Sequence, residues 1–195
     1  MTITCPRCGR GYGAERFAGG RTLHCACGAR VGVPFQSGVA ERPGRPRFLA
    51  DSMLGGLARW LRILGYDAEW EPQIDDRELV RRGLEERRWI LTRDRRLAEA
   101  WWTDSLLLIR ADHPVEQLGE VAARVPISTS RLFTRCSRCN RRLERLPPAE
   151  EARLRPPDVA GPVRRCPRCG RIYWQGSHTA RMRRTLVAAL GAGEQ

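Results

Sequence analysis

The sequence predicts an α/β fold, a parallel sheet with helices on both faces, flanked by two small zinc-ribbon modules. Two observations lead to this fold class. Between residues 47 and 124, short apolar stretches alternate with amphipathic helical patterns, which is typical of a parallel sheet covered by helices. In addition, all eight cysteines fall into two groups of two close pairs, with one group on each side of this segment. Such paired spacing is typical of zinc modules.

The elements of the central segment can be listed in order. Strands are expected at residues 47–50, 68–70, 89–92 and 105–109, and helices at residues 52–65, 76–87, 95–102 and 115–124. Apolar residues recur at helical spacing along the first helix and are expected to be buried: Leu54, Leu57, Ala58, Leu61 and Leu64. Trp60 is expected in the core or in an interface rather than as a platform for stacking bases.

The predicted organisation has five parts. Residues 1–34 form a zinc ribbon, 35–46 a linker rich in Gly, Pro and Arg, 47–130 the α/β domain, 131–184 a second zinc ribbon and 185–195 a tail. The sequence lacks both a membrane-length apolar run and the apolar core of a signal peptide. A soluble, cytoplasmic protein is therefore expected.

Charge is distributed unevenly along the chain. All 35 basic residues are arginine. Residues 1–46 contain seven arginines and two acidic residues, residues 47–130 contain 13 and 15, and residues 131–184 contain 15 and four. Basic ends around an acidic middle favour a polyanionic partner, and we expect nucleic acid. The alternative is a basic surface that serves only for solvation.

The cysteines predict two structural zinc sites. The first quartet is Cys5, Cys8, Cys25 and Cys27, and the second is Cys136, Cys139, Cys166 and Cys169. Disulfides would need an oxidising compartment, and a redox motif would need only one pair. The first quartet has a single residue between Cys25 and Cys27, which is a tighter spacing than usual. Four thiolates close a zinc site, so no catalytic role is expected for either zinc, and His24 and His178 are expected to be surface or packing residues.

Acidic residues recur where the expected strands end. Asp51, Asp94 and Asp112 follow strands, and Asp76 opens the helix after the second strand. The carboxyl ends of parallel strands lie at one rim of a sheet, where ligands bind. Carboxylates gathered there would repel one another unless a cation lay among them, which predicts Mg²⁺ or Mn²⁺ held by Asp51, Asp76 and Asp94. The alternative for each residue is a helix N-cap.

Long motifs in this sequence resemble the Mut-seven C-terminal RNase family, a branch of the PIN-like nucleases. They are "RFLADSMLGGLARWLRILGYD", "DDRELV", "WILTRDRRLA", "EQLGEV", "RCSRCNRRL" and "RCPRCGRIYWQGSHTARM". The resemblance spans residues 47 to 184 and implies a PIN-like sheet, RNase activity, and metal binding by Asp51, Asp76 and Asp94. Ser52 stands where a second acid is expected beside the first aspartate. The amino-terminal ribbon lies outside the resemblance.

These features together predict metal-dependent hydrolysis of phosphodiester bonds in RNA. Single-stranded RNA is the expected substrate, because its bases are open to stacking on aromatic side chains. Thr92 and Asp112 are expected to assist the metal ligands. Arg93 would hold the scissile phosphate, or else form a surface salt bridge. Tyr173, Trp174 and His178 would stack on bases, or the two larger rings would cover the second zinc site. Two other functions remain open, namely a non-catalytic RNA-binding adaptor and a PIN-like toxin-type nuclease.

Overall fold

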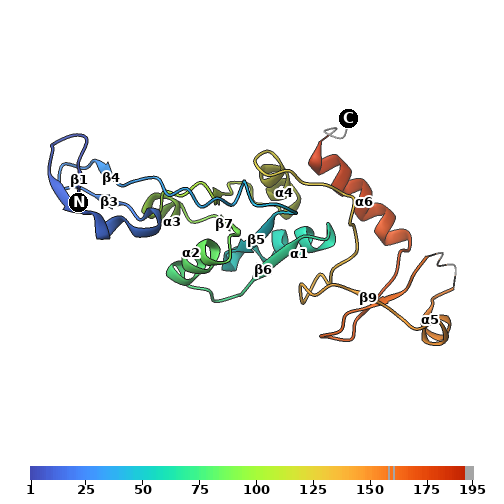
Figure 1. The fold of residues 1–195 in the computed structure, drawn as a ribbon. Helices are drawn as coiled ribbons and strands as arrows, with labels where there is room; N and C mark the ends of the chain where they lie inside the picture. Colours follow the sequence, from blue (N-terminus) through green and yellow to red (C-terminus); the bar gives the residue numbers. More distant parts are fainter. Residues whose placement is uncertain (158, 160, 192–195) are drawn as a thin grey trace. The chain divides into compact units, whose positions relative to one another are not determined.

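The computed structural model describes residues 1–157, 159 and 161–191, and Figure 1 follows the chain through them. The chain divides into two compact units. The first comprises Met1–Leu54 and Trp70–Arg110, and the second comprises Gly55–Glu69 and Ala111–Gln195. Each unit is therefore built from two separate segments of the sequence.

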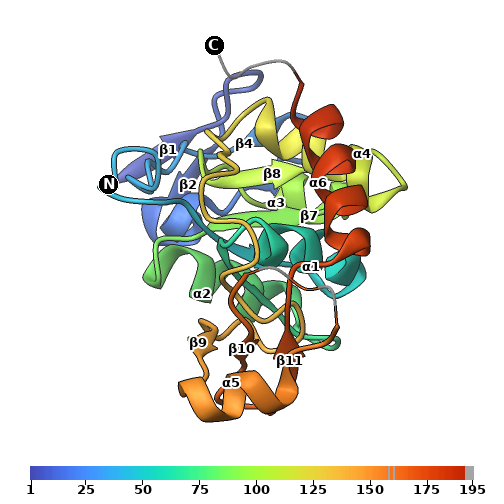
Figure 2. The same ribbon diagram turned by 90° about the vertical axis from the view of Figure 1, so that its right-hand side faces the viewer.

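The predicted parallel sheet is present, with four strands in the order β6-β5-β7-β8. They are β5 (Arg47–Ala50), β6 (Asp67–Trp70), β7 (Trp89–Thr92) and β8 (Leu106–Leu108). Within the first unit, β7 runs parallel to β5 on one side and to β8 on the other, and Figure 2 shows β7 beside β8. All four residues of β7 are buried. Because a central strand has both faces covered, its sequence is continuously apolar up to Thr92.

The predicted helices are also present. They are α1 (Gly55–Ile63), α2 (Asp76–Glu85), α3 (Arg95–Ala100) and α4 (Pro114–Ala122), with a short 3₁₀ helix, η2 (Ser52–Leu54), before α1. In the first unit, α2 packs on β5 and β7, and α3 packs on β8. The buried residues of this part of the core are Leu49, Leu79, Val80, Ile90 and Leu97. The five apolar residues that the sequence predicts as buried before and along α1 all have 0 % of their surface exposed.

The amino-terminal ribbon lies in the first unit and is joined to it through the backbone. It consists of the hairpins β1 (Thr2–Thr4) with β2 (Gly11–Gly13) and β3 (Leu23–His24) with β4 (Arg30–Val31), and of the 3₁₀ segment η1 (Ala14–Gly20). Thr22 N donates to Ala100 O at 2.7 Å, and Phe35 N donates to Trp102 O at 2.8 Å. The predicted linker thus begins with a segment that pairs with the chain after α3.

The second unit contains the remaining helices and the other ribbon. Helix α4 packs against both α1 and α6 (Ser177–Leu190). The close approach of α1 to α4 requires Gly56, because a Cβ there would lie 2.6 Å from Pro114 Cγ. The ribbon contains β9 (Glu144–Arg145), α5 (Pro148–Leu154), β10 (Arg164–Arg165) and β11 (Ile172–Tyr173), whose strands form an antiparallel sheet.

Helix α6 includes residues 185–190 of the segment expected to be a tail, and residues 192–195 of that segment lie outside the described residues. Among the helices that the structure describes, none combines the length and the apolar character of a membrane span.

Candidate functional site

Each of the four cysteine pairs closes through a backbone turn. The residue after each pair donates its backbone N–H to the carbonyl of the first cysteine, as in Gly9 to Cys5 at 3.0 Å and Asn140 to Cys136 at 3.0 Å. Such a turn requires a positive φ. Gly9, Gly28 and Gly170 supply it, and Asn140 supplies it with φ 60°. The turn brings the two sulfurs of a pair to the same side of the chain, as a shared metal requires.

The sulfur geometry fits zinc in both quartets. In each, the four sulfur atoms all lie within 4.8 Å of one another. The Cys8–Cys25 distance is 3.5 Å, and the Cys136–Cys169 distance is 3.8 Å. Four sulfurs at about 2.3 Å from a tetrahedral zinc are separated by about 3.8 Å, so little movement is needed. Both predicted quartets are therefore confirmed as groups that are able to hold zinc.

The tight spacing in the first quartet does not prevent the assembly. The turn at Cys25 closes one residue earlier, with Gly28 N donating to Cys25 O at 2.8 Å. The backbone N–H of Cys27 and the hydroxyl of Tyr12 hydrogen-bond to the Cys25 sulfur and lower the pKa of this thiol to about 6. A thiol that ionises readily suits a metal ligand, because zinc binds the thiolate.

We expect two equivalents of zinc per chain in the purified protein, measured by elemental analysis. Each quartet supplies four thiolates, so each should hold one ion. Cys27→Ser should reduce the zinc content to one equivalent, and so should Cys139→Ser. A wild-type content of one equivalent, unchanged in Cys27→Ser, would contradict the amino-terminal site.

Asp51 lies at the end of β5 and is almost completely buried, with 5 % of its surface exposed. Its Oδ1 accepts hydrogen bonds from Ser52 N at 2.5 Å and Ser52 Oγ at 3.1 Å, and its Oδ2 accepts one from Thr92 Oγ1 at 2.7 Å. A buried carboxylate is costly without such partners. Ser52, at the position where a second acid was expected, therefore orients Asp51.

Thr92 connects Asp51 to Asp94. Thr92 ends β7 and has 0 % of its surface exposed. Its hydroxyl donates to Asp51 and accepts from Asp94 N at 3.0 Å. Asp94 is the N-cap of α3, where its Oδ1 accepts from Arg96 N at 2.7 Å. The N-cap alternative is thus correct for Asp94, but a cap uses one carboxylate oxygen and leaves the second oxygen for another ligand.

Asp76 shares an electrostatic environment with the other two acids. It is the first residue of α2, and the N-cap of this helix is Asp75, whose Oδ1 accepts from Arg77 N at 2.9 Å. Partial burial of its carboxyl group raises the pKa of Asp76, and the charges of Asp94 and Asp51 raise it further. The structure therefore brings these three acids near one another in the first unit. Repulsion of this kind is what a bound cation relieves.

The donor chemistry of this carboxylate rim, defined as Asp51, Asp76 and Asp94, fits a hard divalent cation. Among the described residues, the carboxylates do not form a group whose ligand atoms all lie within 4.8 Å of one another. Mg²⁺ commonly binds one or two carboxylates directly and keeps several waters. The rim therefore offers carboxylate oxygens of the kind that such an ion binds.

The two other residues predicted to assist the site are Arg93 and Asp112. Arg93 lies between Thr92 and Asp94 in sequence and is half-buried. Asp112 is an exposed residue of the second unit, where its backbone carbonyl accepts a hydrogen bond from Gln117 Nε2 at 3.2 Å. The N-cap of α4 is His113 rather than Asp112. No role for either residue follows from these contacts alone.

A groove of about 710 Å³ opens beside Asp76 in the first unit. Its walls include Arg77 of α2, Arg96 of α3, and Arg21 and Trp101, which pair across an isolated β-bridge. The amino-terminal ribbon thus supplies one arginine to the groove. The sequence predicts that this ribbon is basic, but it cannot predict this placement, because the pairing joins residues 80 positions apart.

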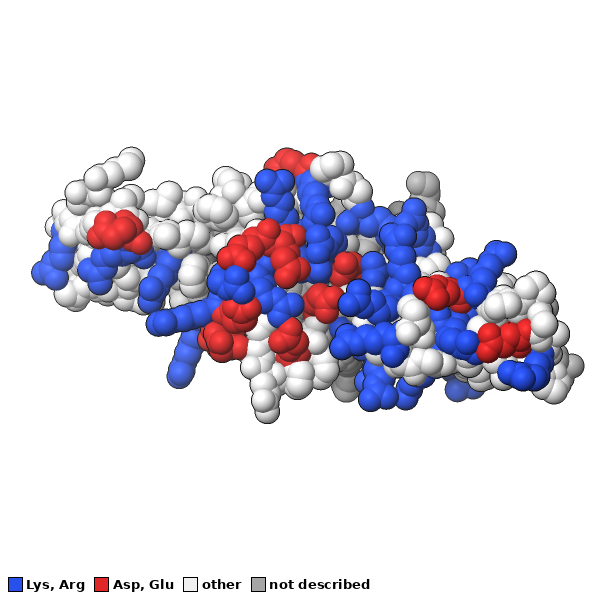
Figure 3. Space-filling view, turned by 60° about the horizontal axis from the view of Figure 1, so that its bottom comes forward, with Lys and Arg blue, Asp and Glu red and all other residues white. Residues whose placement is uncertain are grey.

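Arginine is prominent on the surface as well. Arginine side chains cover much of the face seen in Figure 3, and acidic side chains lie among them in several separate places. A surface of this composition suits phosphate groups, which arginine binds through paired hydrogen bonds.

Sequence reasoning missed two buried polar residues that join the second ribbon to the rest of the second unit. Arg62 of α1 has 5 % of its surface exposed, and its Nη1 donates to Arg138 O at 2.9 Å. Asn140 donates to Asp67 Oδ1 at 2.8 Å and to Glu69 Oε1 at 2.9 Å. The signal for Asn140 was its place after a cysteine pair, where glycine stands in the other three pairs.

Comparison with known protein families gives a match over most of the chain. The family model described as the Mut7-C RNAse domain matches residues 46–186. This range contains the carboxylate rim and the second cysteine quartet, and it excludes the amino-terminal ribbon. Neither a curated protein nor a solved structure matches the chain.

Proposed function

The chain belongs to the Mut7-C RNAse domain family, and on that premise we propose that it is a divalent-metal-dependent ribonuclease acting on single-stranded RNA. The single observation that best supports this proposal is the connection from Asp51 through Thr92 to Asp94, with hydrogen bonds of 2.7 Å and 3.0 Å. It holds two carboxylates at the carboxyl ends of neighbouring strands, where α/β sheets bind ligands.

Mg²⁺ or Mn²⁺ bound at the rim would supply an activated water and neutralise charge on the phosphate as the leaving oxygen departs. Asp51 and Asp94 would hold this ion, and Asp76 would complete its surroundings. Thr92 keeps the Asp51 carboxylate in place because its hydroxyl donates a hydrogen bond to Oδ2. Ser52 fixes the opposite oxygen of the same carboxylate. The residues thus provide an ordered set of oxygen ligands before the metal arrives.

The groove beside Asp76 suits the substrate. Among the described residues, four arginines contribute positive charge to its walls and three acidic residues contribute negative charge, namely Arg21, Arg77, Arg81 and Arg96 against Asp75, Asp76 and Glu78. RNA carries one phosphate for each nucleotide. Arginines along such a groove would hold the phosphates next to the rim. In this proposal the amino-terminal ribbon extends the binding surface of the nuclease, and Arg93 and Asp112 keep the supporting roles that the sequence predicts for them.

A cleavage assay with the purified full-length protein tests the proposal. We expect labelled single-stranded RNA to be cut with added Mn²⁺ or Mg²⁺, and cutting to stop when EDTA removes the added ion. Brief chelation should spare the two zinc sites, whose content is measured in the same sample. Binding of RNA without cleavage under all divalent-metal conditions would instead support the adaptor function.

A further inference from the structure

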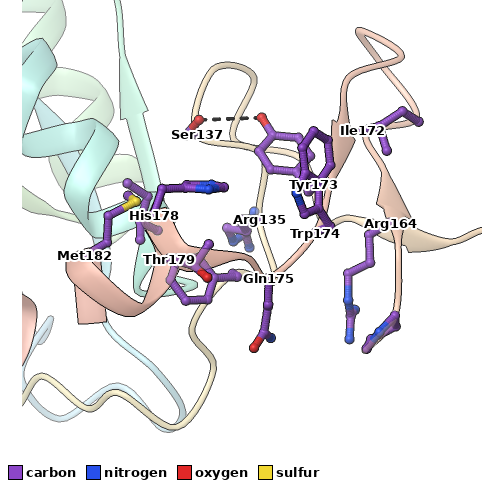
Figure 4. A pocket seen from close by; sticks show the side chains of 13 residues that line it. Arg135, Ser137, Arg164, Ile172, Tyr173, Trp174, Gln175, His178, Thr179 and Met182 are labelled. Atoms are coloured by element: carbon purple, nitrogen blue, oxygen red, sulfur yellow. Dashed lines mark hydrogen bonds between the residues drawn. The ribbon is translucent and has the colours of Figure 1, made fainter. Parts of the chain in front are cut away.

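A cavity of about 260 Å³ lies in the second unit, between the second ribbon and the start of α6. Its polar and aromatic lining includes Arg135, Arg164, Trp174 and His178, and its apolar lining includes Ile172 and Met182. Figure 4 shows how the side chains that line it lie, with His178 and Met182 on α6 and Trp174 and Arg164 on the ribbon side. The volume lies just below the roughly 300–1,000 Å³ of sites for drug-sized ligands, so the cavity can enclose no more than about one nucleotide.

The two adjacent aromatic residues have different roles here. The hydroxyl of Tyr173 lies 3.1 Å from Cys136 Sγ and 3.5 Å from Ser137 Oγ. Burial and the bond to Cys136 raise the pKa of Tyr173 to about 12, so the phenol remains neutral beside the sulfur. Tyr173 therefore covers the zinc quartet, as the packing alternative predicts.

Trp174 is more open to solvent. Its side chain is 37 % exposed, although tryptophan is a large apolar residue. Its ring centroid lies 6.5 Å from that of His178 at an interplanar angle of 85°. The two rings therefore form a corner rather than a stacked pair, and a planar ligand is able to lie against the indole face while His178 borders its edge.

The charge around the cavity fits a phosphate-bearing ligand. Arg164 extends from β10 into the lining, and the strand that carries it is fixed by pairing with Arg145 and Tyr173. Arg135 is oriented by a salt bridge to Asp67 at 3.7 Å. Residues 131–184 contain 15 arginines and four acidic residues. An aromatic face next to arginine is the combination that single-stranded nucleic acids require, because bases stack and phosphates pair with guanidinium groups.

We propose that this cavity binds one nucleotide of the RNA, with its base stacked on Trp174 and its phosphate near Arg164. This proposal rests on the proposed function in one respect, namely that RNA is the ligand of the protein. It adds a binding site built from residues of the second unit, none of which belongs to the carboxylate rim, and this site does not itself take part in cleavage.

Binding is measured by fluorescence anisotropy with a labelled ten-nucleotide RNA and the zinc-loaded full-length protein, without added divalent metal so that the RNA stays intact. Trp174→Ala should weaken binding by about 5- to 150-fold, which corresponds to the loss of one stacked base. Trp174→Phe should keep most of the affinity because it keeps an aromatic face. The matched control is Trp102→Ala, which removes a tryptophan that is 45 % exposed in the first unit and should leave binding unchanged.

Further measurements separate a loss of binding from a loss of folding and locate the bound RNA. Zinc content and melting temperature report whether Trp174→Ala is folded. Ultraviolet crosslinking of wild-type protein to RNA that contains 5-iodouridine, followed by mass spectrometry, should place an adduct on Trp174. Adenosine monophosphate should compete only weakly, because it offers a single phosphate whereas the ten-nucleotide RNA offers many. If it competed as strongly as the ten-nucleotide RNA, the ligand of the cavity would be a free nucleotide, and the proposal would be overturned.

The proposal is also overturned if folded Trp174→Ala binds RNA as tightly as Trp102→Ala and the crosslinks lie elsewhere. Cleavage separates this failure from failure of the proposed function. Active wild-type protein with no effect at Trp174 rejects only the nucleotide site. Loss of RNA binding in Trp174→Ala, combined with wild-type protein that never cleaves, rejects only the nuclease.

Discussion

Asp94→Asn is expected to reduce metal-dependent RNA cleavage by more than about 100-fold. Replacing a residue that only orients a metal ligand already lowers metal affinity or activity by about 10- to 100-fold, and Asp94 is proposed as a ligand itself. Asparagine keeps the size of aspartate and loses the negative charge that Mg²⁺ or Mn²⁺ requires. RNA binding should change little, because arginines provide most of the attraction for phosphate. Cleavage rates at saturating RNA and the dissociation constant measure the two effects separately.

The fold should survive this substitution. Asp94 Oδ1 accepts the N-cap hydrogen bond from Arg96 N, and asparagine caps helices about as well as aspartate. Removing its charge also relieves repulsion, because Asp94 is one of the charges that raise the pKa of Asp76. The metal-free variant should therefore melt no lower than the wild type.

Asp75→Asn is the matched control for the capping function. Asp75 caps α2 with hydrogen bonds from Arg77 N at 2.9 Å and Glu78 N at 3.0 Å, and it is not one of the proposed metal ligands. This variant should keep most of the cleavage activity. Thr92→Val should fall between the two, because it removes the hydroxyl that orients Asp51 and leaves Asp94 N without that acceptor. Equal cleavage activity in Asp94→Asn and Asp75→Asn would show that Asp94 serves only as a helix cap.

The sequence predicts the sheet well because local patterns specify it. The four residues of β7 were predicted with both bounds correct, since a buried central strand must be apolar on both faces. The prediction of the first helix is less accurate at its start, because the predicted range 52–65 divides into η2 and α1. Two consecutive glycines, Gly55 and Gly56, begin α1, and glycine has a low helix propensity.

The acids and the cysteines differ in how far their positions follow from sequence. Cysteine pairs close through local turns, so their grouping follows from spacing alone. The proximity of Asp51 and Asp94 also follows, because parallel strands end at one rim. The hydrogen bonds of Thr92 to both acids, and the place of Arg21 in the groove, depend on contacts between segments distant in sequence. Periodicity carries no information about such contacts.

Loss of one zinc ligand is expected to unfold the second ribbon. The buried cluster around this quartet contains Leu143 and two of the cysteines themselves, with Tyr173 partly buried against it. Leu146 and Val163 of the ribbon are also buried, but they lie outside this cluster. So few apolar side chains around the metal cannot offset the entropy of ordering the ribbon, and the free energy of zinc binding, on the order of 10 kcal/mol in small zinc modules, must do so. Cys166→Ser should therefore reduce zinc to one equivalent and abolish hydrogen-exchange protection of the ribbon.

Cys25→Ser provides the comparison in the first ribbon, and its effect should be smaller. That ribbon buries Phe17 and Val31 beside its cysteines, and the rings of Tyr12 and Phe17 meet edge to face at 6.4 Å. Backbone hydrogen bonds also join it to residues 100–102 of the same unit. Zinc should fall to one equivalent here too, while exchange protection decreases only in part. Equal retention of protection in both variants would show that neither ribbon depends on its metal, whereas complete loss only in Cys166→Ser would tie stability to the size of the apolar cluster.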